Sequence, residues 1–407
     1  MKIYNVVFGG ILALYFSELI FPPITTIVSA TTVCFLCFIA WVSISLLMDK
    51  SFYLKLRVQY ICPILAYLLP VILAYLFGNL TIAHRYMVFA LVPLGNMIYS
   101  FHQSHNQLIM MRKIIKIQVV LSIITGVVTI SALLANPYIS RSIKSSGEHS
   151  LNLARQGIGG YSFIYFAATC GVLILHILWN TKSIKVKIAF GTLLLFDAFL
   201  IVKSSYTTAL LVFVGEIIIY ITLRIGKNRK LGVWRIVLML LLIFALWGTL
   251  LLYSDKILEI LPPRVASIFV SGEGGNAFEL LIEEFVLDRG PQLQLSVDAF
   301  LRHPLFGLLG SGKIGYDGQY LTGFGQHSFI LDTFAIYGAL VGLIVLLALF
   351  APFKNAFKEG KNAAKYALSI SVLTGMLVLY LFNNATESIG FAIGILFPYV
   401  RDNISSE

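Results

Sequence analysis

Charged residues are scarce in this chain. Asp, Glu, Lys and Arg make up only 12% of its 407 residues, whereas 58% are hydrophobic and the mean hydropathy is +0.87. A soluble domain of this size would carry about one quarter charged residues. The composition therefore excludes an ordinary soluble protein and indicates one that is embedded in a membrane.

The sequence also lacks the patterns of a metal or redox centre. All four cysteines fall within apolar runs, where packing is a more common role than redox or metal chemistry. The histidines show no spacing typical of metal ligands. We therefore expect neither a metal nor another cofactor. Internal repeats are not visible either, which makes a repeat-built transporter a weaker expectation.

Long apolar runs recur along the whole chain. A helix needs about 20 such residues to cross a bilayer. The sequence therefore predicts an all-α integral membrane protein with about 12 transmembrane helices, forming a single polytopic domain over residues 1–407. A signal peptide cleaved after Val28-Ser29-Ala30 is the alternative for the first run, but its loss would invert the charge asymmetry described below. The expected spans are 4–22, 25–48, 60–78, 82–101, 115–135, 161–180, 185–202, 206–223, 235–253, 328–352, 364–382 and 386–400.

The positive charge of the chain is distributed by topology. The formal net charge is +11, which could suggest nucleic-acid binding. If the N-terminus is cytoplasmic, however, 20 of the 30 Lys and Arg fall in inside segments and the other 10 in outside segments. This is the positive-inside pattern. We therefore expect the lipid bilayer rather than nucleic acid as a partner, and both termini in the cytoplasm.

Two external loops interrupt the predicted bundle, at about 136–160 and 253–327. The first is rich in Ser and Gly, and the second holds nine of the 19 acidic residues of the chain. Apolar residues at helical spacing predict two amphipathic helices in the second loop, the later one carrying Leu293, Val297, Phe300 and Leu301 on its apolar face. Such helices could form a rim for a lipid-linked substrate at the membrane surface, or simply cap the bundle.

Three arginines in these loops are candidates for binding a phosphate. Arg155 precedes the glycine-rich stretch 157–160, Arg141 lies in the same loop, and Arg289 stands between the two amphipathic helices. A guanidinium offers a planar fork of donors that suits phosphate. The alternatives are a cationic anchor at the membrane edge for Arg155 and an ion pair with a neighbouring acid for Arg289.

His327 precedes the predicted span 328–352. A histidine at a helix start tends to stay neutral because of the helix dipole, and a neutral imidazole can accept a proton from a sugar hydroxyl. Asp332 and Tyr337 follow in that span, and Glu387 lies at the outer end of the last span. An acid within a membrane helix is a hint of function. An ordinary structural role is the alternative for each residue.

Several of these segments follow one another in a recognisable order. They are Arg155 to Tyr161, the serine-rich helix start Lys203 to Ala209, Arg289, His303-Pro304-Leu305-Phe306-Gly307, Gly325-Gln326-His327-Ser328 with Leu331-Asp332, and Tyr337-Gly338. This order resembles the bacterial O-antigen polymerase and O-antigen ligase superfamily. The resemblance is most specific over roughly 289–342. It departs from many members at Ser328-Phe329, where they have Asn.

The resemblance implies a GT-C-like glycosyltransferase of the bacterial inner membrane that acts in the periplasm without a metal. It implies that an undecaprenyl-diphosphate-linked oligosaccharide is the substrate, that Arg155 and Arg289 bind the diphosphate, and that His327 is the catalytic base. Arg141 is a rival for Arg155, and Asp332, Tyr337 and Glu387 are supporting candidates. A chain-length regulator protein is a partner compatible with this family.

Three functions compete on this sequence. The leading expectation is a polymerase that joins O-antigen repeat units. The first alternative is a ligase that transfers glycan to lipid A–core, and the second is a flippase or other carrier of lipid-linked oligosaccharide. A carrier would be expected to show broken helices and charges spread through its spans. The sequence instead concentrates its polar groups in two outer loops.

Overall fold

A computed structural model of the 407-residue chain describes residues 105–143, 148–225, 290–291, 293–310, 328–350 and 363–383, with residue 392 and scattered residues in 9–76 that include 21–27. These residues form α- and 3-10 helices and turns, and no strand occurs among them. The all-α prediction is therefore confirmed for this part of the chain. The principal described helices are η1 (Pro22–Thr26), α6 (His105–Ala135), η3 (Ile139–Ser142), α7 (Glu148–Arg155), α8 (Tyr161–Asn180), α9 (Ile184–Lys203), α10 (Thr207–Ile225), α15 (Gly307–Gly310), α16 (Phe329–Phe350) and α18 (Ala363–Phe382).

Five of the described helices are long and apolar enough to cross a membrane. These stretches are Lys113–Ala135, Tyr161–Asn180, Thr207–Ile225, Phe329–Leu347 and Ala364–Phe382. They agree with the predicted spans 115–135, 161–180, 206–223, 328–352 and 364–382. The predicted span 185–202 is also a helix, α9, which carries more charge along its length. The spans 25–48, 60–78, 82–101, 235–253 and 386–400 lie largely or wholly outside the described residues, so the number twelve stays a prediction.

Large apolar side chains are exposed along the described spans. Val120 on α6, Leu195 on α9 and Leu343 on α16 are each more than half exposed. Apolar surface of this extent is unusual on a soluble monomer. It fits a multi-pass membrane protein whose outer helix faces contact lipid.

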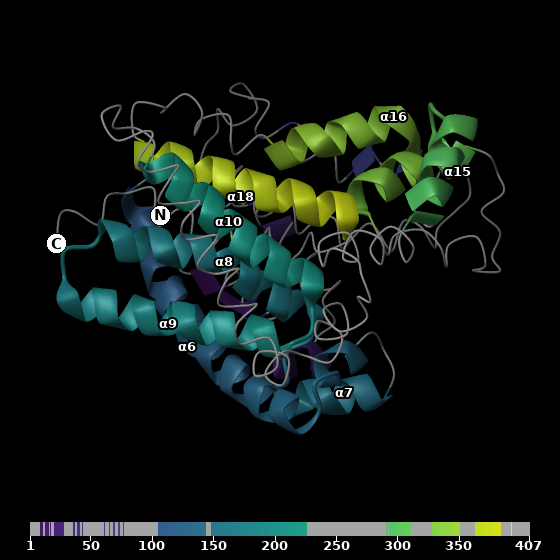
Figure 1. Cartoon of the computed structure of the whole chain (residues 1–407). Coiled ribbons are helices and arrows are strands. Elements are labelled where there is room, and N and C mark those ends of the chain that lie inside the picture. Colours follow the sequence, from purple (N-terminus) through teal and green to yellow (C-terminus); the bar gives the residue numbers. More distant parts are fainter. Residues whose placement is uncertain are drawn as a thin grey trace, which may run out of the picture.

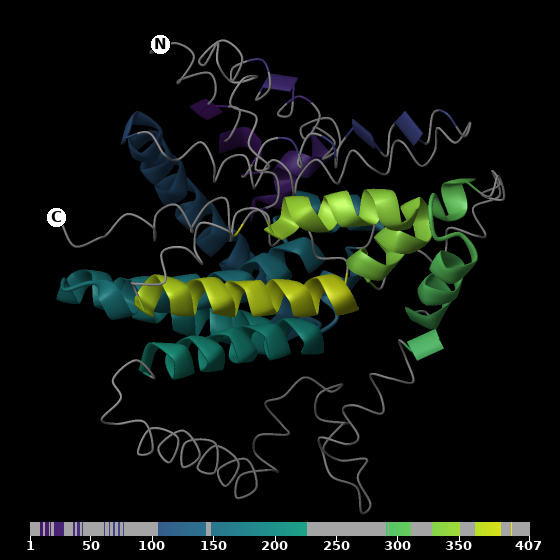
Figure 2. The same cartoon turned by 90° about the horizontal axis from the view of Figure 1, so that it is seen from above.

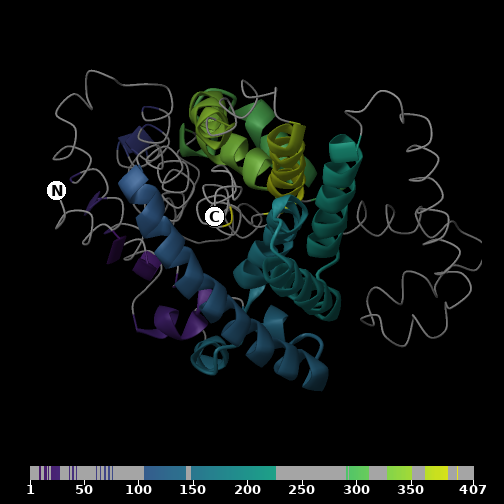
Figure 3. The same cartoon turned by 90° about the vertical axis from the view of Figure 1, so that its left-hand side faces the viewer.

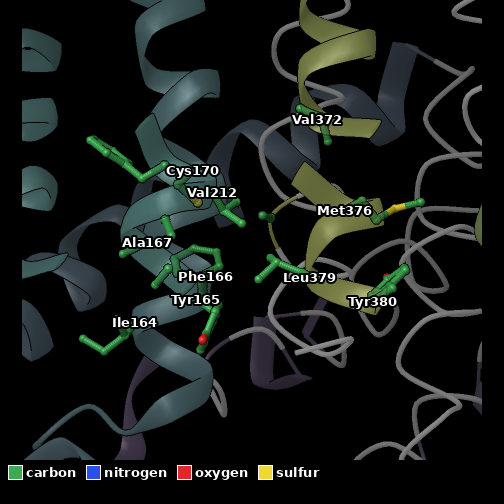
Figure 4. Packing of buried hydrophobic residues seen from close by; sticks show 14 of the residues in the cluster. Ile164, Tyr165, Phe166, Ala167, Cys170, Val212, Val372, Met376, Leu379 and Tyr380 are labelled. Carbon is green, nitrogen blue, oxygen red and sulfur yellow. The ribbon is translucent and has the colours of Figure 1, made fainter. Parts of the chain in front are cut away.

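Helices α8, α9, α10 and α18 lie side by side and form the centre of the bundle (Figures 1 and 2). Apolar residues of α8, including Phe166 and Cys170, pack beside Val212 of α10 and face Met376 and Leu379 of α18 (Figure 4). A side chain at Gly171 would come within 2.2 Å of the Phe213 ring. The absence of a side chain there lets α8 and α10 approach closely, as small residues do between membrane helices.

The described helices alternate in direction between two ends of the bundle. The start of α8 meets the end of α18, because Tyr161 and Tyr165 both hydrogen-bond to Asn383. The other end of α8 meets the end of α10, where Arg224 donates to Asn180 at 2.7 Å. We call the first end, with Tyr161, the tyrosine end, and the second, with Arg224, the basic end. Lysines at the basic end include Lys182 in the α8–α9 connection and Lys185 and Lys187 at the start of α9.

The N-terminal segment runs in the same direction as α6 and beside it (Figure 3). Gln118 of α6 donates to the carbonyl of Ala13 at 3.2 Å. Further towards the C-terminus of both segments, Thr125 of α6 donates to the carbonyl of Ile20 at 2.7 Å. The predicted order of spans requires the first and fifth spans to be parallel. The geometry of the described residues agrees with that order.

Helix α16 is broken at Gly338, where the backbone has φ 76° and ψ −177°. The turn at 303–307 packs into this break. The Ala339 N–H donates to the Pro304 carbonyl at 2.7 Å, and a Cβ on Gly338 would lie 2.2 Å from the Leu305 carbonyl oxygen. Gly307, at φ 62°, meets the backbone of Ile336 just as closely. Only glycine adopts such conformations readily, so the two glycines let the two backbones touch.

The later amphipathic helix of the second loop is present, but it packs through a different face. Residues 293–302 are helical. The predicted apolar face included Val297 and Leu301, which are 37% and 67% exposed. The buried residues are Ser296 and Ala299 instead, because small side chains allow the helix to approach α16 closely.

Candidate functional site

A cluster of polar and aromatic side chains lies at the tyrosine end, and Arg141 is its cation. Residues 139–142 form the short helix η3, which places the half-buried Arg141 guanidinium 4.9 Å from the centre of the Tyr206 ring. The guanidinium also donates to the carbonyl oxygen of Ser205. Arg141 thus joins the segment between α6 and α8 to the connection from α9 to α10.

Two buried hydroxyls beside Arg141 lack a hydrogen-bond partner among the described residues. They are Ser140 Oγ and Ser205 Oγ, in residues that are 0% and 1% exposed. Ser205 also has φ 59°, a left-handed conformation that is uncommon outside glycine. Buried polar groups are normally paired, and backbone strain is often found at functional sites. Ser140 precedes Arg141 in the chain and the Ser205 carbonyl accepts from it, so these residues make the cluster a candidate anion site.

Three tyrosines connect Arg141 to the end of α18. The centre of the Tyr206 ring lies 5.8 Å from the centres of both the Tyr161 and the Tyr165 rings. The centres of the Tyr161 and Tyr165 rings are 4.6 Å apart. The Tyr161 hydroxyl donates to the Asn383 side chain, which in turn donates to the Tyr165 hydroxyl at 2.6 Å. Burial raises the pKa of Tyr206, just before the α10 span, well above its ordinary value, although the Arg141 charge opposes the shift. Tyr206 therefore stays protonated and donates to the Ser140 carbonyl.

The same network extends to the start of α16. The Phe329 N–H donates to the Asn383 carbonyl at 3.1 Å. Asp332, 3% exposed, accepts from the Ser328 N–H at 3.3 Å and from the Ser296 hydroxyl at 2.6 Å. Asp332 thereby ties the helical segment 293–302 to the start of α16. Ser328 directly follows His327 in the chain, and the segment begins shortly after Arg289.

The site residues predicted from the sequence lie in different environments in the structure. Arg141 lies in the cluster and Asp332 joins it through Ser328. Arg155 lies on the exposed side of α7, where it donates to Asn152 of its own helix. Tyr337 is buried in the apolar core, next to the break in α16. His327, Arg289 and Glu387 lie outside the described residues.

The glycine-rich stretch after Arg155 has a packing role. Gly159 is buried, and its N–H donates to the Thr129 hydroxyl of α6 at 2.7 Å. A Cβ on Gly159 would lie 3.0 Å from that oxygen. This stretch therefore carries the chain closely over α6 into α8.

Sequence reasoning missed most of the cluster. Tyr161 and Tyr206 lie in two segments that carry the family resemblance, but the sequence assigned no role to either side chain, and it gave none to Asn383 or Ser296. The signal available was positional: the tyrosines and Asn383 all fall at span ends on the predicted outer side. Antiparallel neighbours bring such ends together.

Buried acids also occur inside the described helices. Asp197 on α9 is 5% exposed and Glu216 on α10 is 1% exposed. The expectation that polar groups are concentrated in the outer loops is therefore incomplete. Both acids lie well inside their helices, away from the Arg141 cluster.

Comparison with protein-family models gave no match, and neither did comparison with curated proteins.

Proposed function

We propose that this chain is a glycosyltransferase that joins undecaprenyl-diphosphate-linked oligosaccharide units at the periplasmic face of the bacterial inner membrane. The observation that carries the proposal is the Arg141 cluster. It combines a held guanidinium, two hydroxyls that have no partner in the described part of the chain, and three aromatic rings at one end of a membrane bundle. A lipid-linked diphosphate would reach such a site from the bilayer.

Arg141 is our preferred first-loop ligand for the diphosphate. Its guanidinium is already oriented by Tyr206 and Ser205, so little side-chain freedom is lost when an anion binds. Arg155 lacks this environment, since it is exposed on α7. Arg289 supplies the second guanidinium of the proposed site. Two guanidiniums can stabilise the charge that develops on a diphosphate leaving group.

The proposed reaction is a single displacement at the anomeric carbon. The acceptor hydroxyl oxygen forms the new C–O bond while the bond from that carbon to the diphosphate breaks. The electron pair leaves with undecaprenyl diphosphate, and the hydroxyl proton passes to the His327 imidazole. Asp332 acts as a positioning residue, because it fixes Ser328, the neighbour of His327, against the segment 293–302.

A carrier of lipid-linked oligosaccharide is the second candidate. Two observations favour it: α16 is broken at Gly338, and Asp197 and Glu216 are buried within helices. Broken helices and intramembrane acids are typical of transporters. The polymerase stays the first candidate because the 303–307 turn packs into the break in α16, where the Pro304 carbonyl accepts from the Ala339 N–H.

Deletion of the gene followed by electrophoresis of lipopolysaccharide separates the candidates. Loss of a polymerase leaves core that carries a single repeat unit. Loss of a ligase or of a flippase leaves bare core. A normal ladder of chain lengths after deletion would contradict all three.

A further inference from the structure

Glu216 occupies a mid-membrane position that the Arg141 site does not use. It lies nine residues after the start of α10 at Thr207. At about 1.5 Å of rise per residue, it is roughly 14 Å into the helix, close to the centre of a hydrocarbon layer about 30 Å thick. An acid at this depth is costly unless it is neutral or paired.

The Glu216 carboxyl lies against the backbone of α18. A Cβ on Gly375 would be 1.7 Å from Glu216 Oε1, so the carboxyl fills the space that a side chain at that position would take. Both carboxyl oxygens are buried, and neither has a hydrogen-bond partner among the described residues. The arrangement therefore holds a neutral acid closely, and the described residues provide no ion-pair partner for a charged one.

The titratable groups around Glu216 come from every helix that packs on it. Cys170 of α8 lies within electrostatic range of both Glu216 and Asp197 of α9. On α10 itself, Tyr220 follows one turn later on the same face. Two cations, Arg224 of α10 and Lys365 of α18, lie within electrostatic range of His176 near the basic end.

A polar path leads from this region to the basic end. The Tyr220 hydroxyl and His176 Nδ1 are 3.0 Å apart and both side chains are buried. One turn further along α8, Asn180 donates to the His176 carbonyl and accepts from Arg224. Histidine and tyrosine can both pass a proton along such a path.

From this geometry we propose that Glu216 is a mid-membrane proton-binding site that exchanges its proton with the basic end through Tyr220 and His176. The ligand is the proton itself, which moves between the carboxyl oxygen and the path without any redox step. The proposal is independent of glycosyl transfer. It holds for a polymerase and for a carrier alike.

The test is chemical labelling of the full-length protein in lipid nanodiscs with dicyclohexylcarbodiimide, an apolar reagent that attacks protonated carboxyls. Peptide mass spectrometry should find the adduct on Glu216, with a yield that falls as the pH is raised. The variant Glu216→Gln should not form this adduct. The control variant Glu148→Gln, which changes an exposed acid on α7, should still form the adduct on Glu216. A water-soluble carbodiimide should modify Glu148 and spare Glu216.

Three results would overturn the site: no adduct on Glu216 at any pH, equal modification by the water-soluble reagent, or protection by sodium or potassium at constant pH. The last result would make Glu216 part of a metal-cation site.

The path is tested by infrared spectroscopy of the Glu216 carboxyl in D2O. Tyr220→Phe should slow deuterium exchange of Glu216 without changing its final extent, and exchange at the unaltered rate would overturn the path.

Discussion

Replacement of Arg141 by alanine should abolish polymer formation while the protein still inserts into the membrane. The change removes a charge-assisted hydrogen bond to the Ser205 carbonyl and a cation–π contact with Tyr206. These interactions contribute about 1.5–3 and about 0.5–2 kcal/mol in general, and Arg141 is only half buried. We therefore expect a loss in stability of about 2 kcal/mol.

The expected loss in activity is larger than this. Removing one preorganised donor to a developing negative charge lowers a rate by about 10²–10³-fold. Arg155→Ala is the matched control, because this exposed arginine comes from the same loop. A surface substitution changes the relevant free energy by about 0.5 kcal/mol or less, which corresponds to a rate change of about twofold.

A second pair of variants separates binding from folding. Arg141→Lys keeps the charge but loses the planar fork, so it should restore only part of the activity. Tyr206→Phe keeps the ring beneath Arg141 and removes the hydroxyl that donates to the Ser140 carbonyl. The measurements are the length distribution of the polymer and the melting temperature of each purified variant. A normal ladder from Arg141→Ala, or equal losses from Arg141→Ala and Arg155→Ala, would refute the assignment.

Three further predictions follow from the loops and the break in α16. Arg289→Ala should abolish polymer without impairing insertion, and Arg289→Lys should restore it only in part; full activity in Arg289→Ala would remove this residue from the site. A single cysteine at Gly274, in a cysteine-free background, should react with an impermeant maleimide in intact cells with a permeabilised outer membrane; reaction only after lysis would invert the topology. Gly338→Ala should cost about 2 kcal/mol or more of stability, because φ is 76° there and the new Cβ would lie 2.2 Å from Leu305. Gly215→Ala is the control and should be close to neutral, since its Cβ would have nothing within 4 Å. Equal melting temperatures of the two variants would argue against the observed packing of 303–307.

The long apolar helices were predictable because their limits are written in the sequence. The run 161–180 follows two glycines and ends before the lysines of the next connection, and α8 has these same bounds. The run 364–382 likewise coincides with most of α18. Hydropathy fixes where a helix must be buried, and few alternatives satisfy the backbone hydrogen bonds inside a membrane.

The break in α16 could not be predicted in this way. The run 328–352 is predominantly apolar, with Asp332 near its start, and Gly338 alone does not end a membrane helix. The break depends on the 303–307 turn, which supplies the Pro304 carbonyl to the Ala339 N–H. A contact between segments separated by a loop has no local signature in the chain.

The choice between Arg141 and Arg155 was open in the sequence for a similar reason. Both arginines lie in the same loop, and the sequence does not show which one faces other parts of the protein. Their difference arises from the η3 turn, which directs Arg141 toward Ser205 at the far end of α9. Glu216 shows the opposite case. A single acid inside an apolar run is visible in the sequence, but only the structure shows that its carboxyl has no hydrogen-bond partner among the described residues.

The most direct test of the proposed function is reconstitution of the purified protein with undecaprenyl-diphosphate-linked repeat units. The account predicts glycans of increasing length and release of undecaprenyl diphosphate. It also predicts that His327→Ala lowers the rate by about 100-fold or more, as expected for the loss of a general base. Failure of the wild-type protein to lengthen the glycan, or near-normal turnover by His327→Ala, would contradict it.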